Sequence, residues 1–134
     1  MGFTLIELLL TVAIVAVIAT IAVPSLASFI REGRRVEAMD ALQEMATKQE
    51  RYYAENAAYT TNENLLGYAA DGFQVTQEGH YQYETNQADA TSYTIIANPL
   101  GDQANDSITR FRLFSTGQKE YRDSGGAWQD GWDD

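Results

Sequence analysis

GFTLIELLLTVAIVAVIATIAVPSLASFIR, residues 2–31, is the stretch of the sequence that decides the fold. Residues 8–30 carry no charge, and as an α-helix they would be roughly 35 Å long at about 1.5 Å per residue. Because the hydrocarbon core of a bilayer is about 30 Å thick, such a helix is long enough to span it. The β-branched residues that are frequent here weaken a helix in water but not in lipid. The sequence therefore predicts a membrane-spanning helix over residues 3–30.

The residues at the start of this stretch fit neither a secretory signal peptide nor an ordinary anchor. A signal peptide begins with Lys or Arg, whereas this sequence begins Met1-Gly2-Phe3-Thr4 and carries an acidic Glu7. In an anchor, a carboxylate at membrane depth is costly unless a partner of opposite charge neutralises it. Glu7 is therefore expected either to lie at the headgroup level or to pair with a positive charge.

The composition limits what the remaining residues can do. The formal net charge is −10 at pH 7, which argues against general nucleic-acid binding. The chain has no cysteine, which excludes a disulfide framework, a thiolate metal site and a cysteine nucleophile. Its only histidine, His80, falls in a predicted loop without a recognisable motif and is expected to be a surface residue. No enzyme activity is predicted.

Beyond Arg31 the pattern becomes amphipathic, which indicates that the helix continues. Glu44 and Lys48 are spaced for an i, i+4 pair, and the helix is predicted to end near Asn56. A stripe of apolar residues at helical spacing is interpreted as core packing. It consists of Ala38, Met39, Leu42, Met45, Ala46 and Tyr53.

The residues after the helix predict a loop, a sheet and a tail. Residues 57–80 lose the helical period and are rich in glycine, which indicates a long loop. Aromatic and β-branched residues then alternate, as is typical of strands with one covered face. We expect Trp128 and Trp132 to hold the tail, residues 123–134, by packing against the sheet. The predicted strands are residues 81–85, 92–97, 108–115 and a short 119–122.

The predicted fold class is therefore α+β, with a long N-terminal α-helix packed on a small antiparallel β-meander. The helix divides into residues 3–30 and residues 31–56, and the meander covers residues 81–122. The globular head as a whole is residues 31–134.

The segment GFTLIEL, residues 2–8, resembles the N-terminus of the type IV pilin and pseudopilin family. The resemblance implies that prepilin peptidase cuts between Gly2 and Phe3, that residues 1–2 are the remnant of a leader, and that Phe3 becomes N-methylated. It also implies that Glu7 is the assembly carboxylate, which pairs with the terminal amine of a neighbouring subunit. The chemistry is consistent, because a buried acid seeks an opposite charge and a newly made amine can supply it.

Pro24 also fits the pattern of the family, in which the helix before this proline loosens when subunits pack into a filament. Proline removes a helical hydrogen bond and clashes with the preceding turn, so residues 16–24 are the expected place for partial unwinding. Many members of the family have a glycine where this chain has Ala16. The alternative is a fixed kink.

The order of helix, loop, meander and tail is similar to the pilin fold, and QERYYAEN at residues 49–56 looks like the PilE-type pilins. The resemblance implies a structural subunit of a type IV pilus that forms a homopolymer through its N-terminal helices, with the pilus assembly machinery as a partner. Adhesion, twitching motility or DNA uptake would be the role of the filament. The alternatives are a type II secretion pseudopilin and a minor pilin with a tip or ligand-binding role.

The charges after the apolar stretch leave two questions open. By the positive-inside rule, Arg31, Arg34 and Arg35 would place the head in the cytoplasm. The resemblance instead implies a single pass through the bacterial inner membrane with the head in the periplasm, and an extracellular pilus after assembly. Together with Glu32 and Glu37, these arginines form either a solvated junction near lipid headgroups or charges that pair between subunits.

Three aspartates are weak candidates for a metal site. Asp102, Asp106 and Asp130 offer the oxygen ligands that calcium prefers, although their spacing matches no EF-hand. Some cysteine-free pseudopilins steady their C-terminal region with calcium. We expect no cofactor, with calcium as the alternative.

Basic residues alternate along the last two predicted strands, at Arg110, Arg112, Lys119 and Arg122. This pattern is interpreted as a solvated face. The alternative is a local patch that binds a ligand.

Overall fold

The computed structural model describes residues 2–132, and the chain divides into two compact units between Gly33 and Arg34. Helix α1 spans Leu5–Asn56 and supplies residues to both units. It ends at Asn56, as the amphipathic pattern predicts. Ala57, directly after it, has a positive φ of 52°, a left-handed conformation that stops the helix.

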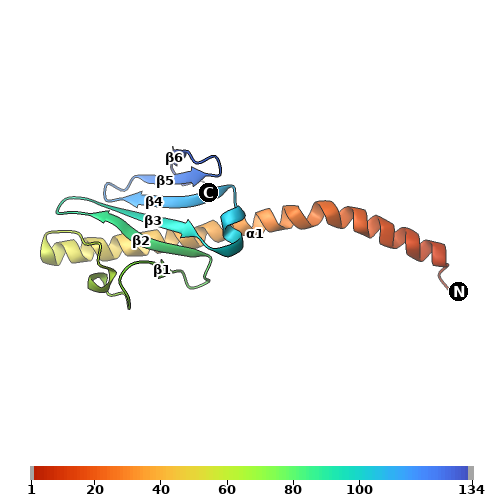
Figure 1. The fold of residues 1–134 in the computed structure, drawn as a ribbon, viewed down its shortest axis with the longest axis horizontal. Coiled ribbons are helices and arrows are strands. Elements are labelled where there is room, and N and C mark those ends of the chain that lie inside the picture. Colours follow the sequence, from red (N-terminus) through yellow and green to blue (C-terminus); the bar gives the residue numbers. More distant parts are fainter. Residues whose placement is uncertain (1, 133–134) are drawn as a thin grey trace. The chain divides into compact units, whose positions relative to one another are not determined.

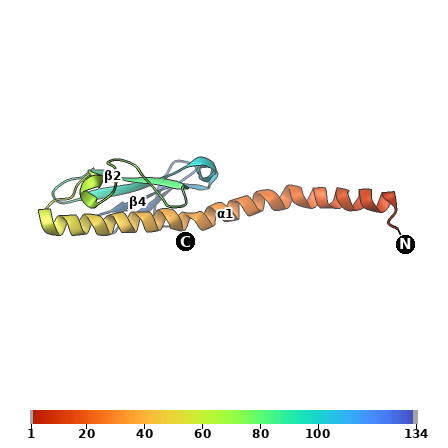
Figure 2. The ribbon, with the colours of Figure 1, turned by 90° about the horizontal axis from the view of Figure 1, so that it is seen from below.

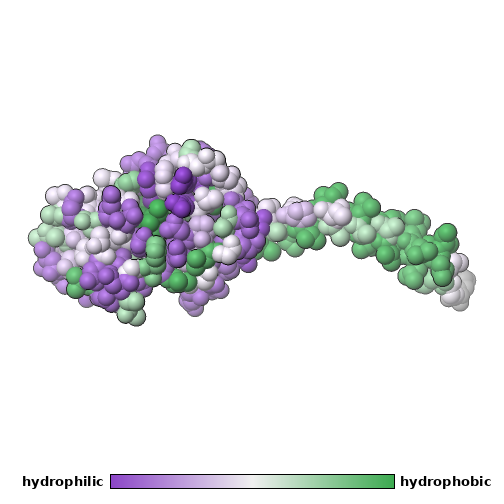
Figure 3. All heavy atoms as spheres, in the orientation of Figure 1, coloured by the Kyte–Doolittle hydropathy of each residue, from purple (hydrophilic) through white to green (hydrophobic). Residues whose placement is uncertain are grey.

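The first unit is the apolar part of α1. Its most apolar window of 18 residues has a mean hydropathy of 2.7, and none of that window is buried. Figure 3 shows hydrophobic side chains over this part of the helix. The helix continues through Pro24 without leaving the α conformation. It is long and apolar enough to cross a membrane.

The second unit is a six-stranded antiparallel sheet with the later part of α1 across one of its faces (Figures 1 and 2). The strands follow one another in chain order, so the sheet is a meander and the α+β prediction is confirmed. Two 3₁₀ helices lie in the connections, η1 at Glu63–Leu66 and η2 at Gly101–Asn105. The strands are β1 (Gln74–Val75), β2 (Tyr81–Ala88), β3 (Tyr93–Pro99), β4 (Ile108–Phe114), β5 (Lys119–Asp123) and β6 (Trp128–Asp130).

Two of these strands, β1 and β6, were not predicted. β1 has two residues and lies inside the region that was assigned to a loop. β6 lies in the region that was assigned to a tail, and it pairs with β5 so that Trp128 lies opposite Arg122. Trp132 packs on the core as expected, with its ring centroid 6.5 Å from that of Phe111. The last two residues, Asp133 and Asp134, and Met1 lie outside the described residues.

The hydrophobic core fills the space between α1 and the inner face of the sheet. Leu42 and Met45 of the helix and Tyr81, Ile95 and Phe111 of the sheet are almost completely buried. Burial alternates along β2 and β3, as expected for strands with one covered face. The prediction for the helix stripe is wrong at its last position. Tyr53 lies at the surface, where its ring stacks on Tyr59 at a centroid distance of 4.6 Å.

A fully buried amide, Gln49, connects α1 to the loop and the sheet. Its Nε2 donates to the carbonyl of Thr60 (2.6 Å) and to the hydroxyl of Thr85 (2.9 Å). Its Oε1 accepts from the N–H of Thr60 (3.2 Å). The N–H and the carbonyl of Thr60 are shielded from water and need hydrogen-bond partners inside the protein. The amide of Gln49 supplies both partners, and it thereby fixes the start of the loop.

We expect Gln49→Leu to lower the free energy of unfolding by about 1–3 kcal/mol, because it leaves the polar groups of Thr60 without partners inside the protein. The measurement is denaturant unfolding of the full chain in detergent, followed by near-ultraviolet circular dichroism. Gln43→Leu, at an exposed position of the same helix, is the control and should change stability little. Equal losses in the two variants would contradict this role of Gln49.

Candidate functional sites

The start of α1 is fixed by reciprocal hydrogen bonds between Thr4 and Glu7. The N–H of Glu7 donates to the hydroxyl oxygen of Thr4 (3.3 Å). The N–H and the hydroxyl of Thr4 both donate to Oε2 of Glu7, at 3.0 and 2.9 Å. This is a capping box, which satisfies backbone groups that the first turn of a helix leaves free. Glu7 thus has a role within its own chain that our sequence interpretation missed, although the Thr-x-x-Glu spacing predicts it.

Glu7 is also the one charged residue before Arg31 in the sequence. It lies at the exposed surface of the first unit, surrounded by apolar side chains such as Ile6 and Leu8 that are exposed as well. A surface with this composition can pack on lipid or on another apolar helix, but its single carboxylate then requires a proton or a cation. The capping box leaves the Glu7 carboxylate able to bind such a proton or cation, because an ionised carboxylate can accept about four hydrogen bonds.

The residues of the predicted cleavage site precede the helix. Gly2, Phe3 and Thr4 are not helical, and the side chain of Phe3 is 92% exposed. A peptidase needs an accessible backbone, and Gly2 and Phe3 are both exposed and outside the helix. Cleavage and methylation at this bond remain predictions.

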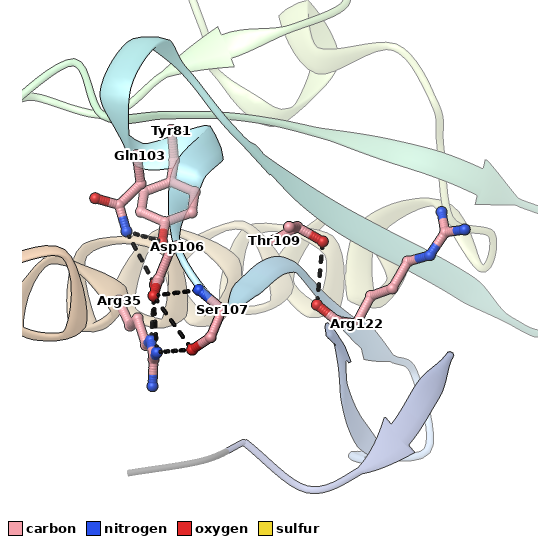
Figure 4. A network of polar contacts seen from close by, with 7 residues as sticks. All are labelled: Arg35, Tyr81, Gln103, Asp106, Ser107, Thr109 and Arg122. Atoms are coloured by element: carbon pink, nitrogen blue, oxygen red, sulfur yellow. Dashed lines mark hydrogen bonds and ion pairs between the residues drawn. The ribbon is translucent and has the colours of Figure 1, made fainter. Parts of the chain in front are cut away.

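The charged cluster that follows the apolar stretch is only partly at the surface, since Arg35 is buried inside the head (Figure 4). Its Nε and Nη2 donate to the two carboxylate oxygens of Asp106, both at 2.8 Å. Nη2 also donates to the hydroxyl of Ser107 (2.9 Å). The amide of Gln103 donates to Asp106 (3.3 Å) and to the phenol oxygen of Tyr81 (2.8 Å). The expectation of a solvated or intersubunit role is therefore wrong for Arg35.

Burial alone would raise the pKa of the Asp106 carboxyl, but the hydrogen bonds and the charge of Arg35 outweigh it and hold this pKa below its ordinary value. Asp106 is consequently ionised at neutral pH and forms a bidentate pair with the arginine. The pair attaches α1 to the connection between β3 and β4.

Glu37 also turns toward the head, where it contacts His80. Its Oε2 lies 2.8 Å from Nδ1 of His80, and both side chains are largely buried. Burial would raise the pKa of Glu37, but hydrogen bonds from Thr76 and His80 lower it. The expectation that His80 is a simple surface residue is wrong, because it links the start of β2 to α1.

The four basic residues of the last strands lie on two faces of the sheet. The register pairs Arg110 with Arg122 and Arg112 with Glu120, and these side chains are on the face turned away from α1. Arg112 forms an ion pair with Glu120, and its guanidinium lies 3.9 Å from the ring centroid of Trp128. Lys119 is on the other face, with Nζ 4.6 Å from the ring centroid of Trp132.

The aspartates that were considered for calcium do not form a metal site among residues 2–132, where no three acidic or histidine side chains converge. Asp106 is engaged by Arg35, as described above. Asp130 accepts a hydrogen bond from Gln118 (3.3 Å). The donor set therefore fits calcium poorly, because this ion takes six to eight oxygen ligands.

An apolar N-terminal helix that continues as the backing of an antiparallel meander defines the class of pilin-like subunits. Residues 24–111 match the family described as type IV minor pilin ComP, DNA uptake sequence receptor. The chain is 32% identical over 100 residues to the type IV wide pilus major component PilA4 of Thermus thermophilus, with 75% of this chain and 74% of that protein covered. It is 36% identical over 70 residues to the type IV major pilin protein PilA of Myxococcus xanthus.

The second match covers 52% of this chain and 32% of the Myxococcus protein, so the chain spans about a third of that relative. The family match and the Thermus relative each include most of the head. The chain belongs to the type IV pilin family.

Proposed function

We propose that the chain is a structural, non-catalytic subunit of a type IV pilus, which is held in the bacterial inner membrane by residues 3–30 until prepilin peptidase cleaves it. The subunit then polymerises with other copies through this helix, and the pilus assembly machinery moves it out of the membrane. The observation that carries the proposal is an apolar helix surface with no side chain buried by its own chain and with one acidic residue near its start.

The apolar surface supports this proposal because it requires a second apolar surface in every state. In the membrane that surface is lipid, and in a filament it is the helices of neighbouring subunits. Cleavage after Gly2 would create a positive amine at Phe3, four residues before Glu7. A neighbouring subunit that is displaced along the filament axis can place its Glu7 beside that amine. The head would then face the periplasm before assembly.

A DNA-receptor role, which the description of the matched family names, is not proposed for this chain. Its net charge of −10 opposes the phosphate contacts that dominate affinity for DNA. Neither of the two pilin relatives is a secretion pseudopilin by its description, which favours a pilus over a secretion system.

The proposal predicts long filaments on the cell surface that consist of a processed subunit. Electron microscopy of sheared filaments, combined with mass spectrometry of their N-terminus, tests both parts. We expect a chain that begins at Phe3 and carries one additional methyl group. A surface filament that lacks this chain, or a mature chain that retains Gly2, would overturn the proposal.

A further inference from the structure

The face of the sheet that is turned away from α1 contains an open hollow of about 720 Å³. Its floor is formed by side chains of β2 to β5, among them the amides of Gln82 and Asn98. Phe73, just before β1, lines one side, and its ring is 52% exposed. A hollow of this volume is within the range of small-ligand sites, and its lining combines polar groups with one aromatic ring.

Two arginines face this hollow from directly opposite positions. Arg110 of β4 and Arg122 of β5 are register partners, and both line the hollow. Among the described residues neither forms an ion pair, in contrast to Arg112, which is paired with Glu120. Like charges at opposite positions of adjacent strands destabilise a sheet. In a chain with 19 acidic and 9 basic residues, the repulsion within this arginine pair is thus not offset by an ion pair among the described residues.

The surroundings hold one member of this pair, Arg122, in place. Nε of Arg122 donates to the carbonyl of Gly126 (2.9 Å) in the turn between β5 and β6. The hydroxyl of Thr109 donates to the backbone carbonyl of Arg122 (3.1 Å), next to the irregular register between Ile108 and Arg110 (Figure 4). Because one guanidinium nitrogen is already bound, the remaining donors of Arg122 are oriented before any ligand arrives.

The lining indicates which anion these donors fit. A guanidinium binds a carboxylate through two parallel hydrogen bonds. The neighbouring amides and hydroxyls can bind the hydroxyl groups of a sugar, and the exposed ring of Phe73 can cover an apolar face of a sugar ring. Glu84 and Asp123 also line the hollow, and with the net charge of the chain they repel a densely charged polyanion such as DNA.

We propose that this hollow binds a carboxylate-bearing saccharide, whose carboxylate is held by Arg110 and Arg122 while Phe73 contacts the sugar ring. The proposal deepens the proposed function and relies on it in one respect. In a filament built around its helices, the face turned away from α1 is the face that remains open to a surface polysaccharide. The binding site itself belongs to the single subunit.

The test uses the full chain in detergent, so that binding is measured without polymerisation. Isothermal titration calorimetry with trigalacturonic acid, a saccharide with three carboxylates, should give binding that weakens as salt is added. The neutral trisaccharide galactotriose should bind at least tenfold more weakly. Arg110→Gln and Arg122→Gln should each reduce the affinity for the acidic saccharide about tenfold, since each removes a hydrogen bond to a charged group. Phe73→Ala should weaken it as well.

Arg51→Gln is the matched control, because Arg51 is exposed on α1 and lies outside the hollow. It should leave the affinity unchanged, and the unfolding midpoints of all variants should show that the head remains folded. Equal binding of the neutral saccharide, or unchanged affinity in both hollow variants, would overturn the proposal. So would a DNA duplex that binds through the same two arginines more tightly than the acidic saccharide does. A subunit that binds as expected yet never polymerises would contradict the pilus proposal and leave this one intact.

Discussion

Replacing Glu7 by glutamine is expected to abolish filament assembly while the start of α1 remains intact. Glutamine at this position of a capping box still accepts the hydrogen bond from the N–H of Thr4, so the helix keeps its cap. It lacks the negative charge that would neutralise the amine of a neighbouring subunit. Removing one partner of a buried ion pair costs about 3–5 kcal/mol, which weakens association between subunits by roughly a hundredfold or more. The yield of sheared filaments measures the effect.

Thr4→Ala is the matched control, since it removes part of the cap and leaves the charge of Glu7 in place. It should cost about 1 kcal/mol of helix stability and still permit filaments. If Glu7→Gln assembles normally and Thr4→Ala does not, the capping box is the essential role of Glu7. The proposed pairing with an amine would then be wrong.

The parts of the fold that the sequence predicted are those with a local signal. The end of α1 at Asn56 follows from a helical period that stops there, and β2 to β4 follow from alternation over several residues. The short strand β5 follows from the turn residues 116–118 before it. β1 and β6 have two and three residues, which is too short for alternation to be recognised. They form because neighbouring strands offer free hydrogen-bonding groups along their edges.

The roles of the charged residues near Arg31 could not be predicted in the same way. Arg35 and Asp106 are 71 positions apart, and Glu37 and His80 are 43 apart. No periodicity connects such residues, so a mixed cluster of charges was interpreted as a solvated junction. The position of Arg35 on the helix already indicated that it is buried. It lies on the same face of α1 as the buried residues Ala38, Leu42 and Gln49. Two polar residues on an otherwise apolar helix face indicate buried partners elsewhere in the chain.

The largest loss of head stability is expected from Arg35→Met, which leaves the carboxylate of Asp106 buried without its cation. Breaking a buried pair from one side costs about 3–5 kcal/mol. The double variant Arg35→Met with Asp106→Leu should recover most of this loss, because an apolar pair of similar volume has no charge to desolvate. Arg51→Met, at an exposed site on α1, should change stability by about 0.5 kcal/mol or less. Denaturant unfolding of the full chain in detergent measures all three.

The same pair makes a testable contribution to acid stability. The pKa of Asp106 in the folded head is lower than its ordinary value of 3.8, so the folded state binds this proton less readily than the unfolded state. The contribution of the pair is therefore fully present above pH 3.8 and is lost as the pH falls through the folded pKa. We expect the wild type to lose more stability than the double variant as the pH falls from about 5 to about 2. Parallel curves for the two proteins over this interval would show that Arg35 does not stabilise the ionised form of Asp106.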